Sequence, residues 1–224
     1  MRTASRRLAA CLVAVAGCAL TSAAGAQVTQ EERDAMVYAH NVVRGAATPY
    51  PFPALAAVSW SATREAVAQA WATGCTFAHS GTPSVGESIY AFASIPDPVP
   101  RPHPDLPVVS WDSERAYYNY AANTCSPPPI PGTCGHYTQL VWRSSTSIGC
   151  GLKYCEVNSP FGPSFPHWWF WVCQYSPAGN VNPAVNRPYL CDYDSNGSFE
   201  SVCTGGLYLD GFEVGAERWS AKTP

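Results

Sequence analysis

Apolar residues near the start of the chain recur every three to four positions, the spacing that places them on one face of a helix. Thr29 and Glu32 have the form of a capping box, in which two side chains satisfy free amides at a helix start. The run PYPFP after Arg44 ends such a helix, because proline lacks an amide hydrogen. We therefore predict a helix from Thr29 to about Arg44, whose buried face carries Met36, Val37, His40 and Val43.

Further helices are predicted along the next part of the chain. Ser61 suits a helix N-cap, and Gly74 suits the exit of the same helix. A short helix is expected around Glu87, and a longer one from about Val108 to Ala121. The many prolines between Ile95 and Pro107 predict a loop there.

Two later segments favour strands. Residues 148–154 and 168–175 are rich in aromatic and β-branched side chains, and the turn-rich run NSPFGPSFP joins them. They should pair antiparallel, with a further strand near Ser59. Side chains alternate between the faces of a strand, so the second segment should present two pairs to opposite faces: Trp169 with Trp171, and Trp168 with Phe170. Both faces need a cover of helices, which predicts a mixed α and β fold.

The first 26 residues have the form of an export signal. Three arginines precede the apolar run LAACLVAVAGCAL, and Ala24-Gly25-Ala26 offers a cleavage site before Gln27. The apolar run is shorter than the roughly 20 residues that cross a bilayer, so we expect no transmembrane segment. An alternative is a lipoprotein signal, with Cys18 as the lipid-anchored residue.

Charge narrows the classes of partner. The chain holds 13 Lys and Arg against 16 Asp and Glu, and three of the arginines lie in the leader, so 10 basic and 16 acidic residues remain at a net charge of −6. Nucleic-acid binding needs a basic face, so we predict no nucleic-acid partner.

Ten cysteines point to disulfides. Cys11 and Cys18 lie in the leader, which leaves eight in an exported chain, an even number. The residues alone leave many pairings open. A zinc site made of cysteines is less favoured, because no Cys-x-x-Cys pair recurs.

Five segments in this order resemble one family. They are CTFAHS, VGESIY, WDSE, the run CGHYTQLVWRSSTSIGCGLKYC from Cys134 to Cys155, and WWFWVCQYSPAGN. Together they resemble the CAP superfamily of cysteine-rich secretory proteins, antigen five and plant pathogenesis-related class 1 proteins, over roughly His40 to Asn180. The resemblance implies an α+β fold, a three-layer α-β-α sandwich with a small antiparallel sheet, stapled by disulfides. It divides the chain into a signal peptide (1–26), a CAP domain (27–180) and a cysteine-containing extension (181–224).

The resemblance also implies the disulfide pairing. It pairs Cys75 with Cys155, Cys125 with Cys134, and Cys150 with Cys173, which leaves Cys191 for Cys203.

Four residues match the family's cleft: His79, Glu87, Glu114 and His136. Neutral imidazoles bind zinc, and carboxylates orient imidazole N–H groups or metal-bound water. We therefore expect His79 and His136 to face each other and to bind a divalent metal, zinc, together with waters. The alternative is a hydrogen-bonded network without metal.

Catalysis is less favoured than binding. A serine-type hydrolase would need Ser80, Ser88 or Thr138 as the nucleophile beside a histidine, and no Gly-x-Ser-x-Gly elbow is present. A metal-assisted, protease-like hydrolase is the remaining enzyme hypothesis. The resemblance implies instead a small apolar ligand, a sterol or a fatty acid.

The extension differs in composition from the domain. Asp192, Asp194 and Asn196 open a calcium-type loop, but the twelfth position is Cys203 where glutamate is required, so any calcium site is partial and a simple turn is the alternative. The final LDGFEVGAERWS resembles a C-terminal sequence of exported bacterial proteins, which implies a bacterial source. We expect the extension to be a semi-independent appendage.

The sequence thus predicts a secreted, monomeric CAP-domain protein that binds a small apolar ligand, a divalent metal or both. A surface or host-interaction protein that acts through its loops and extension is the third hypothesis.

Overall fold

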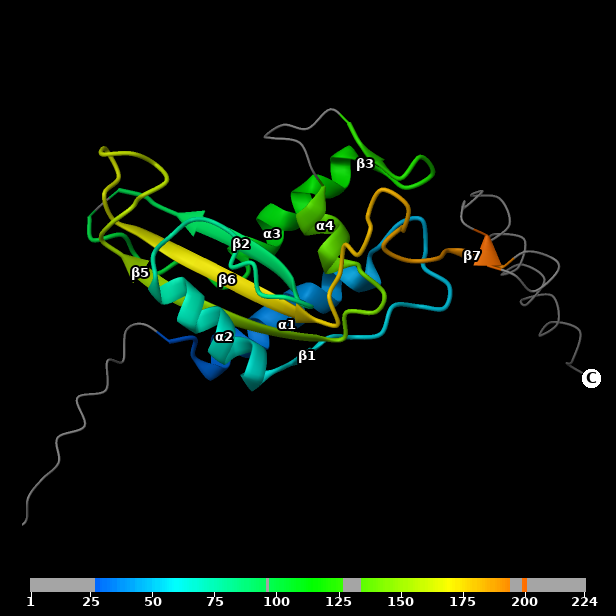
Figure 1. Ribbon diagram of the computed structural model, residues 1–224, viewed down its shortest axis with the longest axis horizontal. Coiled ribbons are helices and arrows are strands. Elements are labelled where there is room, and N and C mark those ends of the chain that lie inside the picture. The colour runs from blue at the N-terminus through cyan, green and yellow to red at the C-terminus, as the bar shows by residue number, and fades with distance from the viewer. Residues whose placement is uncertain (1–26, 96, 127–133, 194–198, 201–224) are drawn as a thin grey trace, which may run out of the picture.

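A mixed four-stranded sheet forms the centre of the molecule in the computed structural model, which describes residues 27–95, 97–126, 134–193 and 199–200. The strand order is β1 (Ser59–Trp60), β5 (Ser147–Cys155), β6 (Trp168–Ser176) and β2 (Gly86–Phe92) (Figure 1). The predicted antiparallel pairing of β5 with β6 is confirmed, and the short β1 pairs parallel to β5.

The short helix predicted around Glu87 is wrong, because this segment is strand β2. It pairs antiparallel with β6 over its whole length, from Gly86 opposite Tyr175 to Phe92 opposite Trp169. The segment is short, and seven residues of sheet pairing outweigh its weak local preference. As a result Glu87 projects from an edge strand.

One face of the sheet is covered by α2 (Ala62–Thr73), which begins after the predicted cap Ser61. Two glycines of β5 let the helix backbone approach closely. A Cβ added at Gly151 would lie 2.4 Å from Gln69 Cα, and one at Gly149 would lie 2.1 Å from the amide nitrogen of Glu65. The Gln69 side chain also bonds both backbone groups of Leu152, at 3.0 and 3.1 Å. The helix is therefore fixed in register along the strand.

The other face is covered by α1 (Gln30–Gly45), α3 (Leu106–Asp112) and α4 (Gly135–Leu140). The capping box of Thr29 and Glu32 is confirmed. The long helix expected up to Ala121 is wrong, because it ends at Asp112 and continues as the 3-10 helix η1 (Ser113–Tyr117). The Asn-rich segment that follows forms instead a hairpin of β3 (Tyr118–Asn119) and β4 (Thr124–Cys125), in which Asn123 adopts the left-handed conformation, φ 53°.

The alternation predicted for β6 is confirmed by two separate cores. Trp169 and Trp171 pack with the α1, α3 and α4 side, whereas Trp168 and Phe170 pack with α2. These tryptophans are at most 7% exposed, so they fill the core.

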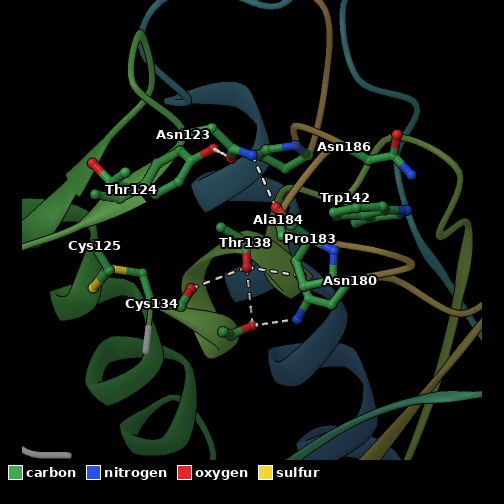
Figure 2. A pocket seen from close by; sticks show the side chains of 13 residues that line it. Asn123, Thr124, Cys125, Cys134, Thr138, Trp142, Asn180, Pro183, Ala184 and Asn186 are labelled. Carbon is green, nitrogen blue, oxygen red and sulfur yellow. Dashed lines mark hydrogen bonds between the residues drawn. A yellow bond between two sulfur atoms is a disulfide. The ribbon is translucent and has the colours of Figure 1, made fainter. Parts of the chain in front are cut away.

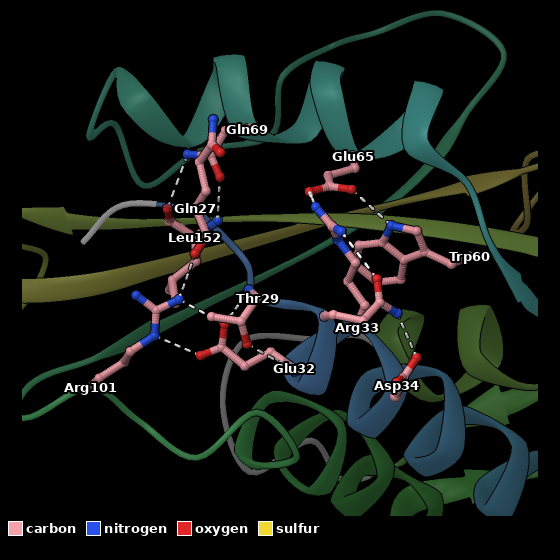
Figure 3. A network of polar contacts seen from close by, with 11 residues as sticks. Gln27, Thr29, Glu32, Arg33, Asp34, Trp60, Glu65, Gln69, Arg101 and Leu152 are labelled. Carbon is pink, nitrogen blue, oxygen red and sulfur yellow. Dashed lines mark hydrogen bonds and ion pairs between the residues drawn. The ribbon is translucent and has the colours of Figure 1, made fainter. Parts of the chain in front are cut away.

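Polar contacts tie the start of α1 to its neighbours (Figure 3). Arg101, in the predicted proline-rich loop, binds Glu32 through Nε and Nη2 at 2.6 and 2.7 Å. Arg33 binds Glu65 of α2 at 2.6 Å, and the Trp60 indole donates to the same carboxylate. The two helical layers are thereby linked around the edge of the sheet.

Three predicted disulfides are confirmed: Cys75–Cys155, Cys125–Cys134 and Cys150–Cys173. Cys191 is also disulfide-bonded, and its predicted partner Cys203 lies outside the described residues.

Residues 187–191 pack against the domain, so this part of the predicted extension is not the loose appendage that its composition suggests. Tyr189 is 2% exposed and stacks on Tyr120 at 4.9 Å. The backbone N–H of Arg143 donates to Pro188 O at 2.7 Å.

The calcium-type turn lies beyond this packed segment. β7 (Asp192–Tyr193) pairs with β8 (Phe199–Glu200), whereas Asp194 and Asn196 lie outside the described residues. The calcium site therefore stays a prediction, as do the leader (1–26) and the domain boundary at residue 180. Among the described residues, no helix is long and apolar enough to cross a bilayer.

Candidate functional site

Two of the four predicted cleft residues, His79 and Glu87, form a pair at the β2 edge of the sheet. His79 Nδ1 is 3.0 Å from Glu87 Oε1, and the backbone N–H of Ser80 donates to the same oxygen at 2.8 Å. The Ser80 hydroxyl and Gln174 Nε2 donate to Oε2 at 2.5 and 3.2 Å. The carboxylate is thus held by four donors, while the His79 side chain is 60% exposed.

These contacts shift the pKa values of both partners. The hydrogen bond to Glu87 raises the pKa of His79, against a smaller opposing effect of burial. Burial raises the pKa of Glu87, but the hydrogen bonds from His79, Ser80 and Gln174 outweigh it and lower this pKa overall. When the imidazole is neutral, the ionised carboxylate holds its proton on Nδ1, which leaves a lone pair on Nε2.

The other two predicted cleft residues, His136 and Glu114, form a second pair, which joins α4 to η1. His136 Nδ1 is 2.7 Å from Glu114 Oε1, and Oε2 accepts the backbone N–H groups of His136 and Tyr137 at 2.9 and 3.0 Å. The imidazole stacks on the Trp111 indole, with centroids 5.9 Å apart and planes at 17°. This ring too is fixed at Nδ1 and on one face.

The two pairs are formed separately. Within the described residues no hydrogen bond or ion pair joins His79 or Glu87 to His136 or Glu114. Nor does any group of three or more His, Cys, Asp and Glu side chains in those ranges lie close enough to hold a metal ion. The zinc site at the two histidines therefore stays a prediction.

None of the hydroxyl groups considered as nucleophiles is bonded to a histidine ring. Ser80 Oγ donates to Glu87, Ser88 is fully buried, and Thr138 Oγ1 donates to Cys134 O at 3.0 Å. The described residues thus contain no serine or threonine paired with His79 or His136.

Two further histidines form carboxylate pairs away from these positions. His103 Nδ1 is 2.5 Å from Asp105, and His167 Nδ1 is 2.7 Å from Asp97, both on exposed loops. Because they are histidine–carboxylate pairs of the same type, they serve as controls for His79–Glu87 and His136–Glu114.

A cavity of about 380 Å³, which sequence reasoning missed, lies beside α4 (Figure 2). The β3–β4 hairpin supplies Tyr118 to its wall, and the chain after α4 supplies Trp142. The Cys125–Cys134 disulfide forms another part. The remaining wall comes from the segment after β6, through Asn180, Pro183, Ala184, Asn186 and Pro188.

Polar atoms around this cavity mostly bond to one another, as Figure 2 shows. The Thr138 hydroxyl, whose one hydrogen is shared with Cys134 O, lies 2.8 Å from Asn180 Oδ1, and Asn180 Nδ2 donates to Gly135 O at 2.8 Å. Asn123 accepts from the Tyr118 hydroxyl at 2.7 Å and donates to Pro183 O at 2.9 Å. The surface left for a ligand is therefore mostly apolar, from rings, prolines and the disulfide.

The family model of the cysteine-rich secretory protein family, CAP, matches residues 37–175, which include both histidine–glutamate pairs. The chain belongs to this family. A pathogenesis-related protein of type PR-1 from Sambucus nigra is 37% identical over 166 residues, which cover 72% of the chain and 84% of that protein. Human peptidase inhibitor 16 is 36% identical over 191 residues, covering 85% of the chain. The chain spans only 37% of the length of this human relative and 30% of the mouse one.

Solved structures of CAP proteins share the fold. Schistosoma mansoni venom allergen-like protein 4 matches with a TM-score of 0.54 and 21% identity, covering 75% of this chain and 99% of that one. The structure described as NaASP2 with Zn²⁺ matches with a TM-score of 0.56 and 21% identity, over 79% and 96% of the two chains. These likenesses support the three-layer arrangement.

Proposed function

We propose that this CAP protein is exported and binds a small apolar ligand, a sterol or a fatty acid, in the cavity beside α4. The observation that carries the proposal is a wall mostly of carbon around about 380 Å³. This volume falls within the range of about 300 to 1,000 Å³ typical of small-molecule sites. Tyr118 and Trp142 are the aromatic side chains among the described residues that line this cavity.

Export is supported by the family and by the chemistry of the chain. Human cysteine-rich secretory protein 2 is 34% identical over 160 residues, and three disulfides join described cysteines. Disulfides persist in oxidising compartments outside the cytosol.

Equilibrium binding of radiolabelled cholesterol and palmitate to delipidated protein tests the proposal. Ala184 is exposed and lines the cavity, so Ala184→Trp should fill it without disturbing the core. We expect wild type to bind one of the two ligands, and Ala184→Trp to weaken that binding at least tenfold. Ala57→Trp, at an exposed position that does not line the cavity, should bind as wild type does. Absence of binding to wild type, or equal binding by the two variants, would reject the proposal.

A second candidate function is binding of a divalent metal by His79 and His136. It is supported by the two pairs: Glu87 holds Nδ1 of His79 and Glu114 holds Nδ1 of His136, so the lone pair of each Nε2 is left to bind a metal ion. Two protein ligands suit a weak, water-rich site, since catalytic zinc usually has three. The metal would supply Lewis acidity, and the glutamates would fix the orientation of the imidazoles.

Zinc titration by calorimetry tests this candidate. The variants His79→Ala and His136→Ala should each lose the tightest site, whereas His103→Ala and His167→Ala, which break pairs of the same type, should retain it. Loss of zinc in the control variants, or its retention in both test variants, would reject a shared site.

A further inference from the structure

We propose that a second cavity, beside Trp142 and Arg187, binds a phosphate group, either as the free ion or as an ester. This cavity measures about 360 Å³ and is lined by residues 142–144 and 185–190. It shares Trp142, Asn186 and Pro188 with the cavity beside α4, here called the first cavity. The inference concerns a separate site and does not depend on the apolar ligand.

Arg187 brings a positive charge to the second cavity in a fixed position. Nε donates to Tyr120 O at 3.0 Å and Nη2 donates to Ala121 O at 2.7 Å, and the guanidinium lies 5.7 Å from the centroid of the Tyr120 ring. Within the described residues, Nη1 has no hydrogen-bond partner and Arg187 forms no ion pair. The side chain is half-buried, so its charge is positioned without being neutralised there.

The indole of Trp142 offers a second donor. The residue is only 7% exposed, and its N–H forms no hydrogen bond with any residue that the structure describes. In Figure 2 the indole nitrogen lies at the end of the ring that points away from Thr138, a residue of the first cavity. Because the rest of the ring is buried, packing fixes the direction of this donor.

The charges that line the second cavity favour an anion. None of its described lining residues is an aspartate or a glutamate, and Arg143 adds a second guanidinium, which donates to Phe52 O and Pro53 O at 2.8 and 3.1 Å. Burial raises the pKa of Tyr120 to about 12, and Arg187 and Arg143 both oppose this rise, so both positive charges lie near one ring. Two guanidinium groups in one cavity favour a ligand with more than one negative charge.

The arrangement of the donors favours a phosphate over a carboxylate. A carboxylate pairs best with a guanidinium edge that offers two parallel N–H groups. In Arg187 one such edge is occupied, because Nε and Nη2 donate to Tyr120 O and Ala121 O. The donors that remain are single groups on separate residues, including Nη1 of Arg187, the indole of Trp142 and the hydroxyl of the exposed Ser144. A phosphate group, with its several strong acceptor oxygens, can bind such separate donors together.

Calorimetric titration with inorganic phosphate, at an ionic strength held constant with chloride, tests the proposal. Arg187→Gln should weaken phosphate binding at least tenfold, the usual effect of losing a hydrogen bond to a charged group. Trp142→Phe keeps an aromatic ring and loses the N–H, so it should weaken phosphate binding severalfold. Arg187→Lys keeps the charge and should bind phosphate more tightly than Arg187→Gln. Arg64→Gln removes the same charge from α2 and should bind phosphate as wild type does.

Two further measurements separate this site from the apolar one and the free ion from an ester. Ala184→Trp changes a residue that lines only the first cavity, so it should bind phosphate as wild type does. Glycerol 3-phosphate is titrated in the same way. Tighter binding than that of inorganic phosphate would assign the site to a phosphate ester, and weaker binding would assign it to the free ion.

The proposal fails if wild type is not saturated by phosphate in the millimolar range, or if Arg187→Gln binds phosphate as wild type does. It also fails if Arg187→Lys binds no better than Arg187→Gln, because Arg187 then acts on the shape of the cavity and not through its charge. Unchanged affinity in Trp142→Phe would place the ion away from the indole and reject the site as described. If phosphate binds as expected while cholesterol and palmitate do not bind, the proposed function fails and this inference stands.

Discussion

Removing one disulfide at a time should separate the stability of the fold from the function of the cavity. Cys75–Cys155 ties the end of α2 to the end of β5 and spans 80 residues, whereas Cys125–Cys134 spans 9. Only the shorter bridge lines the proposed cavity. We consider the double alanine variants of each pair, which remove the same atoms and differ mainly in the length of the loop released.

The loop lengths give the expected losses of stability. The entropy of closing a loop of about 80 residues corresponds to about 4.5 kcal/mol, and that of a loop of about 9 residues to about 2.6 kcal/mol. Because the loss of sulfur atoms is common to both variants, the difference of about 2 kcal/mol is better determined than either value.

Urea unfolding, followed by tryptophan fluorescence, measures this difference as a free energy of unfolding. The variant without Cys75–Cys155 should be the less stable but should bind the apolar ligand as wild type does at low urea. The variant without Cys125–Cys134 should be the more stable of the two but should bind the ligand more weakly. Equal losses of stability would refute the loop argument, and unchanged binding by the second variant would refute a role of the shorter bridge in the site.

Three further results are expected. Gly151→Ala should destabilise the fold by about 1 to 3 kcal/mol in urea unfolding, because the new methyl group meets the backbone of Gln69 at 2.4 Å; an unchanged midpoint would show that α2 can move away. Burial lowers the pKa of His40 from 6.5 to about 4, so as pH falls the unfolded chain binds a proton before the folded protein does. The free energy of unfolding should therefore fall by about 3 kcal/mol between pH 6.5 and pH 4. His40→Gln should flatten this part of the stability profile, and an unchanged slope in the variant would contradict the role of His40. NMR titration should give His79 a pKa above 6.5. The stability that the protonated His79 contributes to the fold is therefore complete below pH 6.5 and is lost as pH rises through the folded pKa. Glu87→Gln should lower the pKa of His79, and an unchanged value would exclude the hydrogen bond to Glu87 as the cause of the raised pKa.

The structure confirms the features that were predicted from local sequence patterns. The capping box at Thr29 and the alternation in β6 each depend only on residues that are close together in the sequence. The segment around Glu87 is a strand and not the predicted helix, because its conformation depends on contacts with β6, which lies far along the chain. The helix that contains Val108 ends before the predicted Ala121, since the hairpin turn at Asn123 competes with it.

The four residues His79, Glu87, Glu114 and His136 could be selected from sequence because each lies in its own family motif, whereas their division into two pairs became visible only in the structure. The cavity could not, because its wall combines Tyr118 of a short hairpin with Pro183 and Pro188, from a segment beyond the part that the family model matches. The useful signal was the change of composition after Asn180, which suggested a separate appendage. In fact this segment packs against Tyr120 and closes the wall.

A crystal structure of the protein with palmitate would test the central claim most directly. The account predicts electron density for the alkyl chain in the cavity between Tyr118 and Trp142. Density for the ligand elsewhere on the molecule, with this cavity filled only by water at a palmitate concentration that saturates binding, would contradict the account.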